Sequence, residues 1–229
     1  MSKKKVSDQD QFESVENALS RTEHYIEQNQ KSLTIIVLAI IVIVGGYLGY
    51  QRFVVSPKEK EAQSQMWMAE QYFARDSFNL AIHGDGNYLG FLDIVEEYSI
   101  TKSANLANYY IGISYLRLGN FEEAIDYLKA FESDDKMVAP IAYGAIGDAN
   151  MELGNTEEAL RFYEKAVTKS ENEFTTPIYL MKVGFVHEQS EDYQKALETY
   201  QSIKDKFPES AEGRQIDKYI ARVEALMNS

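Results

Sequence analysis

A set of small residues recurs through the second half of the chain, and its spacing constrains the fold more than any other feature. Three glycines lie 35 and 37 residues apart, and three alanines repeat the same steps; they are Gly112, Gly147 and Gly184, and Ala124, Ala159 and Ala196. A glycine inside a helix costs about 1 kcal/mol relative to alanine, so its recurrence indicates that a second helix passes close by. Self-similarity at this period predicts an array of helix pairs, each burying its apolar face against the next.

The residues around these glycines resemble the tetratricopeptide repeat, a helix pair with a nominal period of about 34 residues. The motif reads Asn108-x2-Ile111-Gly112-x2-Tyr115, and its counterparts begin at Tyr143 and Leu180. The resemblance implies an all-α solenoid, which we expect to occupy residues 56–229. Its expected parts are a degenerate repeat at about 59–103, repeats at about 104–138, 139–174 and 177–208, and a C-terminal capping helix at 210–227.

Local signals predict where individual helices begin. Gly86-Asn87-Tyr88 precedes the similar Gly119-Asn120-Phe121 by 33 residues, which predicts a first helix over roughly 59–82 and a second over 87–98 in the degenerate repeat. Asn120 and Asn155 are each followed three residues later by Glu, and this spacing predicts side-chain N-caps of the capping-box type.

Ahead of the array lies an uncharged run from Leu33 to Tyr50, 18 residues bounded by Lys31 and Arg52. At about 1.5 Å per residue it extends about 27 Å, close to the hydrocarbon thickness of a bilayer. We therefore expect a transmembrane helix at 32–55. A cleaved signal peptide is the alternative, although it calls for a shorter apolar core, a shorter leader and a small-residue cleavage site.

Two further features belong to this membrane segment. Gly45 and Gly49 form a small-xxx-small pair beside Gly46, which favours close packing against another membrane helix, although ordinary glycine usage explains it equally well. The preceding leader, residues 1–31, has an apolar helical stripe opposite acidic residues, which predicts a short amphipathic helix; the stripe is Phe12, Val15, Leu19, Thr22 and Ile26.

The distribution of basic residues predicts the orientation of the chain. Five lysines and arginines precede the apolar run, including Lys3, Lys4 and Lys5, and three follow it closely. This excess favours a cytoplasmic N-terminus. The array is then expected in the periplasm of a Gram-negative cell, anchored in the inner membrane by a single span.

Composition excludes several classes of function. The formal net charge is −13, which argues against a nucleic-acid binder, because such proteins need a basic face. The chain has no Cys and only three His without ligand spacing, so we expect no metal and no cofactor. The segment from His83 to Asn87 lacks the completed spacing of a calcium loop and is expected to be a turn. The sequence therefore predicts a non-enzymatic protein.

Tetratricopeptide arrays usually bind partners on the inner face of their first helices. Transferring the groove positions of the repeat places Leu106, Tyr109, Ile113, Leu116, Arg117, Ile141, Asp148, Met151, Ile178, Met181, Phe185 and Glu188 on that face. The Lys and Asn that grip chaperone carboxylates in some members are absent from these positions. An apolar groove with Met and aromatic residues suits extended or helical hydrophobic segments. The alternative is that a neighbouring helix, such as the capping helix, fills it.

The order of the parts is similar to that of the ancillary SecYEG translocon subunits of the YfgM type. The leader carries Glu16-Asn17-Ala18-Leu19, and the anchor ends in Gln51-Arg52-Phe53 before a small acidic repeat domain. This resemblance implies an inner-membrane protein docked on SecYEG, working with a membrane-anchored periplasmic peptidyl-prolyl isomerase of the PpiD type and meeting secretory client proteins. The alternative is an adaptor in another envelope complex, for cell division or outer-membrane assembly, without client binding.

Overall fold

The computed structural model describes residues 8–228, with side chains described for His24 and from residue 26 onward. The described residues are helical or irregular, without a strand, which confirms the all-α prediction. The chain divides into two compact units at Pro57 and Lys58. The helices are α1 Asp8–Tyr50, the π-helix η1 Gln51–Val55, α2 Ser56–Ala74, α3 Phe78–His83, α4 Phe91–Glu97, α5 Lys102–Leu118, α6 Phe121–Ala130, α7 Val138–Glu152, α8 Thr156–Lys169, α9 Thr176–Gln189, α10 Tyr193–Lys206, the 3-10 turn η2 Gly213–Gln215, and α11 Asp217–Met227.

The first unit contains the apolar run. Among the described residues, one helix, from Ile26 to Ala74, is long and apolar enough to cross a membrane. Its isoleucines and valines point outward, with Ile35 67% and Val42 71% exposed. Exposed side chains of this kind suit lipid better than water. The leader backbone is helical from Asp8, but the side chains of the predicted stripe up to Thr22 lie outside the described residues.

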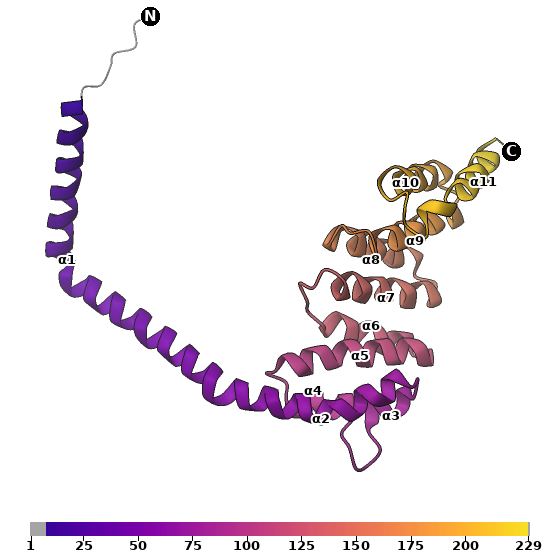
Figure 1. Ribbon diagram of the computed structural model, residues 1–229, viewed down its shortest axis with the longest axis horizontal. Coiled ribbons are helices and arrows are strands. Elements are labelled where there is room, and N and C mark those ends of the chain that lie inside the picture. The colour runs from indigo at the N-terminus through magenta and orange to yellow at the C-terminus, as the bar shows by residue number, and fades with distance from the viewer. Residues whose placement is uncertain (1–7, 229) are drawn as a thin grey trace, which may run out of the picture. The chain divides into compact units, whose positions relative to one another are not determined.

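The second unit is a stack of antiparallel helix pairs, running from α2, α3 and α4 at one end to α10 and α11 at the other (Figure 1). Four apolar clusters follow one another along the stack in place of a single central core. The recurring glycines make this spacing possible. A methyl group added at Gly112 would overlap Leu128, and at Gly147 or Gly184 it would overlap the ring of Tyr163 or Tyr200.

The degenerate repeat differs from the prediction of one helix over 59–82. The helix instead ends at Ala74, and α3 starts anew at Phe78. The cause is Asp76, whose φ of 57° is left-handed and cannot continue a right-handed helix. After this turn, α3 places Ala81 and Ile82 in the core, where both are fully buried.

The predicted second helix of this repeat also begins later, at Phe91 rather than at 87. The preceding segment is the expected turn, because the Asp85 carboxylate accepts hydrogen bonds from the backbone N–H groups of Asn87 and Tyr88, at 2.9 and 2.8 Å. The Tyr72 hydroxyl donates to the same carboxylate at 2.7 Å. These bonds hold 85–88 in a loop that a helix cannot include.

The structure confirms the predicted N-cap positions of two helices, but the predicted side-chain hydrogen bonds are absent there. Asn120 and Asn155 occupy the N-cap positions of α6 and α8, but neither side chain makes a capping hydrogen bond. Their carbonyls instead accept the first helical bonds, from Ala124 and Ala159. Side-chain capping occurs at Thr101, whose hydroxyl accepts from Ala104, and at Asp192. The predicted closing helix at 210–227 starts with the 3-10 turn, and its regular part begins at Asp217.

Candidate partner-binding groove

A groove of about 840 Å³ lies between the first helices of successive repeats, α5, α7 and α9. Six of the residues predicted for a groove line it together: Ile113, Leu116, Arg117, Ile141, Asp148 and Met151. The structure adds Phe121, Ala145, Glu152, Tyr163, Tyr179 and Lys182, together with the end of α5 at Leu118 and Gly119. Most of these residues are aliphatic or aromatic, but four are charged, and the surface that the groove exposes is more polar than apolar.

Close packing between repeats builds the floor of the groove. The Tyr179 ring from α9 fills the space above Gly144 on α7, where any side chain would overlap it. Tyr179 stacks with Tyr163 at a centroid distance of 6.5 Å. Burial is the main cause that raises the pKa of Tyr179, and the negative charge of Asp148 raises it further. Both rings thus remain neutral phenols at physiological pH, and the floor presents no tyrosinate charge.

Two of the four charges at the groove wall, Asp148 and Lys182, are paired within the array, whereas Arg117 and Glu152 are exposed and form no ion pair among the described residues. The Tyr163 hydroxyl donates to the Asp148 carboxylate at 2.7 Å, and Lys182 forms an ion pair with the same carboxylate. Burial is the main cause that raises the pKa of Tyr163, and the hydrogen bond to Asp148 adds to it. Asp148 therefore has a phenol and an ammonium as partners, so an incoming ligand meets a locally neutral surface there.

A tyrosine, an acid and a base are combined in the same way one repeat later. The Tyr200 hydroxyl donates to Glu188 at 3.0 Å, and Arg222 from α11 pairs with that carboxylate at 2.7 Å. In both cases a tyrosine of the second helix meets an acid of the first helix and a base of the next one. The sequence did contain a signal, since Tyr163 and Tyr200 are 37 residues apart. The acids do not keep that spacing, so the motif was missed.

The remaining predicted groove residues lie elsewhere. Leu106 and Tyr109 pack against the first and second apolar clusters. Ile178 lines a separate hollow with Phe174 and Pro208, and Met181 is buried in the last cluster. Phe185 and Glu188 face α11, where the Phe185 ring lies 5.5 Å from that of Tyr219. The capping helix therefore packs against the third repeat at Phe185 and Glu188, although the Phe185 side chain stays 37% exposed, whereas the wall between α5 and α7 is open.

The glycines of the apolar run have free surroundings within the first unit. A methyl group at Gly45, Gly46 or Gly49 would meet nothing within 4 Å. Packing of this face against another membrane helix therefore stays a prediction.

Over the described residues, no group of three or more His, Asp or Glu side chains converges as a metal site.

Comparison with known proteins agrees with the repeat architecture. Two models of the tetratricopeptide repeat match residues 109–173 and 179–210. The chain is also similar in fold to the nearly identical TPR-like repeats of a putative kinesin light chain from Podosopora anserina, with a TM-score of 0.55, 15% identity, and coverage of 74% of this chain and 88% of that one.

Three curated relatives share 26–28% identity with the chain. They are tetratricopeptide repeat protein 29 of Macaca fascicularis (28% over 49% of this chain), the chloroplastic protein FLUORESCENT IN BLUE LIGHT of Arabidopsis thaliana (26% over 69%), and the uncharacterized protein ycf37 of Guillardia theta (28% over 50%). The matches cover 26%, 48% and 65% of the lengths of these relatives. Residues 109–173 and 179–210 therefore carry tetratricopeptide repeats, which the structure stacks as helix pairs beside an open groove.

Proposed function

We propose that the chain is a membrane-anchored, non-enzymatic accessory subunit of the Sec translocon, with its array on the periplasmic side of the inner membrane. In this proposal the groove binds hydrophobic segments of a membrane-anchored peptidyl-prolyl isomerase chaperone, of emerging secretory proteins, or of both. Anchoring raises the effective concentration of the groove beside the channel exit, so weak contacts suffice.

The open wall between α5 and α7 is the observation that carries the proposal. Ile113, Leu116, Ile141 and Met151 present apolar surface, and the Asp148 carboxylate beside them is already paired. Burying the apolar side chains of a ligand against these four residues is favourable, while Arg117 and Glu152 add one charge of each sign at the groove. Segments with hydrophobic side chains on one face are the class it suits.

Co-purification tests the proposal. We would extract the full chain in mild detergent and quantify SecYEG and the isomerase in the eluate, for the wild type and for Ile113→Asp with Ile141→Asp. Both side chains are only partly buried, so the variant should keep its helicity and lose at least tenfold in partner yield. The control is Gln201→Asp, on the exposed surface of α10. Unchanged yields from a folded groove variant would remove the groove from the proposal.

The second candidate is an adaptor of another envelope complex, without client binding. The contacts of α11 with Phe185 and Glu188 favour it, because α11 occupies part of the surface that would otherwise lengthen the groove. The same eluates separate the two, because an adaptor would bring down division or outer-membrane assembly proteins in place of Sec subunits.

A further inference from the structure

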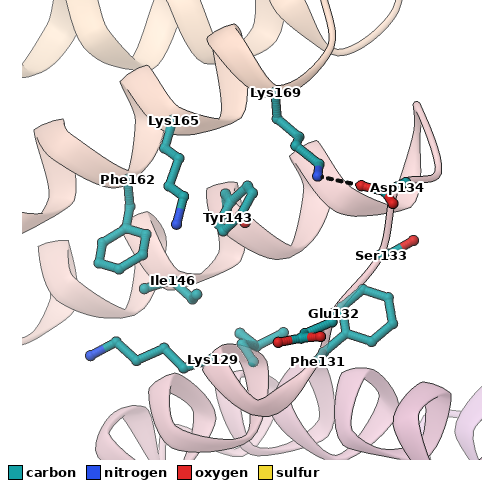
Figure 2. Close-up of a pocket in the computed structure, with 11 residues that line it drawn as sticks. Lys129, Phe131, Glu132, Ser133, Asp134, Tyr143, Ile146, Phe162, Lys165 and Lys169 are labelled. Carbon is teal, nitrogen blue, oxygen red and sulfur yellow. Dashed lines mark hydrogen bonds and ion pairs between the residues drawn. The ribbon is translucent and has the colours of Figure 1, made fainter. Parts of the chain in front are cut away.

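A second hollow, of about 720 Å³, opens between α6, α7, α8 and the loop that follows α6 (Figure 2). At about 100° per residue, Tyr143 and Ile146 of this hollow project from the side of α7 opposite to Ile141 and Asp148, which line the groove. The two sites are thus separate surfaces of one helix. The side chains that matter for the second one are Lys129, Lys165 and Lys169, and Phe131, Tyr143 and Phe162.

Two lysines at this hollow hold their charge over aromatic rings. The Lys165 ammonium lies 4.2 Å from the centroid of the Tyr143 ring, and the Lys129 ammonium lies 5.8 Å from that of Phe162. Neither lysine forms an ion pair in the part of the chain that the structure describes, whereas Lys169 pairs with Asp134 at 2.9 Å. Figure 2 shows Lys165 directed into the space beside Tyr143. Two ammonium groups therefore lie at the hollow without an ion pair among the described residues. The Glu132 carboxylate also lines the hollow but pairs with neither of them.

The hollow is built in advance of any ligand. The Asn105 side chain bonds the backbone of Glu132 in both directions, donating at 2.8 Å and accepting at 2.9 Å. The Asp135 carboxylate accepts from the N–H groups of Met137 and Val138, which fixes the loop to the start of α7. A site that is already ordered loses little conformational entropy on binding.

We propose that this hollow, which we name the Lys129–Lys165 pocket, binds an acidic linear segment of a partner polypeptide. An apolar or aromatic side chain of the segment enters beside Phe131 and Phe162, and its Asp or Glu carboxylates pair with Lys129 and Lys165. Charge complementarity selects this occupant, because the exposed cations stand out in a chain of net charge −13. A partner held here leaves the groove on the other side of α7 free.

The test uses the full chain in nanodiscs of neutral lipid and a phage library of random dodecapeptides. The library is selected in parallel on the wild type, on Lys129→Glu with Lys165→Glu, and on Lys58→Glu with Lys218→Glu. The last variant makes the same change of net charge, and its Lys218 also lies over an aromatic ring, 4.8 Å from that of Tyr219. Helicity and thermal unfolding are measured for each, and the milder Lys129→Gln with Lys165→Gln replaces the reversal variant if it unfolds.

Some peptides should be selected on the wild type and on the control but not on the Lys129/Lys165 variant. We expect these peptides to be rich in Asp and Glu next to Phe, Tyr or Leu. The strongest of them, labelled and measured by fluorescence anisotropy, should lose at least tenfold in affinity with that variant, stay unchanged with the control, and weaken as salt rises. If the peptides that are selected on the wild type and not on the Lys129/Lys165 variant were no richer in Asp and Glu than the library, the proposal would be overturned. Equal affinity for the variant would also overturn it, as would a wild type that sediments as a dimer and a variant that sediments as a monomer, since a second copy would then be the occupant.

Discussion

Glu59 is the residue that joins α2 to the start of α5. Its carboxylate accepts hydrogen bonds from the backbone N–H of Lys102 at 2.7 Å, from the hydroxyl of Ser103 at 2.8 Å and from the amide of Gln63 at 3.0 Å. A negative charge at a helix N-terminus also interacts favourably with the helix dipole. Desolvation raises the pKa of Glu59, but the hydrogen bonds from Ser103, Lys102 and Gln63 outweigh it and leave the pKa below its ordinary value.

Glu59→Gln should therefore destabilise the array by about 1.5–3 kcal/mol at neutral pH, the range for hydrogen bonds to a charged group. Because the folded-state pKa is the lower one, the contribution of the carboxylate is complete above the ordinary value of 4.5. It is lost as the pH falls through the folded-state pKa. Urea unfolding followed by Trp67 fluorescence measures this, with Glu224→Gln on α11 as the control. A difference between wild type and variant that stays constant from pH 7 to pH 3 would contradict the assignment.

The helix glycines make a second prediction at this scale. Gly147→Ala or Gly184→Ala forces a methyl group against the ring of Tyr163 or Tyr200, so either should lower the free energy of unfolding by about 1–3 kcal/mol despite the better helix propensity of alanine. Gly49→Ala is the matched control, since its methyl meets nothing within 4 Å. Thermal unfolding of the array followed by circular dichroism gives the comparison. Equal melting temperatures for all three would mean that the glycines do not set the helix spacing.

Among the elements, α11 closes the array. Val223 of this helix is fully buried, and Ile216, the residue before the helix begins, is 1% exposed. Both side chains belong to the cluster that contains Tyr200 and Ile203. Each repeat of a solenoid is stabilised mainly by its neighbours, so loss of the cap should affect the last repeat most.

Val223→Asp should therefore raise hydrogen exchange in α9 and α10 at least tenfold and leave α5 and α6 nearly unchanged. The buried carboxylate detaches α11 and exposes the Phe185 and Tyr219 ring contact to water. Exchange measured by mass spectrometry on the full chain resolves the helices, and Glu224→Asp at the exposed neighbouring position is the control. A uniform rise from α5 to α10 would show that the array unfolds as one cooperative unit.

The sequence predicted the regular repeats well because small residues at a fixed period report directly on helix packing. It failed where a single turn decides the path, as at Asp76, since a left-handed residue other than glycine has no marked sequence signal. The six groove residues between α5 and α7 could be placed by transfer from the repeat. The Lys129–Lys165 pocket could not, because its lysines come from different repeats and only the packed structure brings them together.

On the scale of the whole molecule, the proposal depends on which side of the membrane the array occupies. The chain has no cysteine, so a single Ser190→Cys at the exposed end of α9 provides a unique label site on the array. We expect a membrane-impermeant maleimide to label it in cells whose outer membrane has been made permeable, whereas Ser2→Cys in the leader should react only after the inner membrane is lysed. The reverse pattern would place the array in the cytoplasm and exclude a role in secretion.

Photo-crosslinking from within the groove in living cells tests whether hydrophobic segments of partners bind between α5 and α7. A photoreactive p-benzoylphenylalanine at Ile113 would lie on the open wall between α5 and α7, and the same group at Gln201 on α10 would serve as the control. We expect mass spectrometry to find hydrophobic segments of the isomerase, of Sec subunits or of secretory proteins joined to position 113 and absent from position 201. Equal products at both positions, or none from the groove, would contradict this expectation.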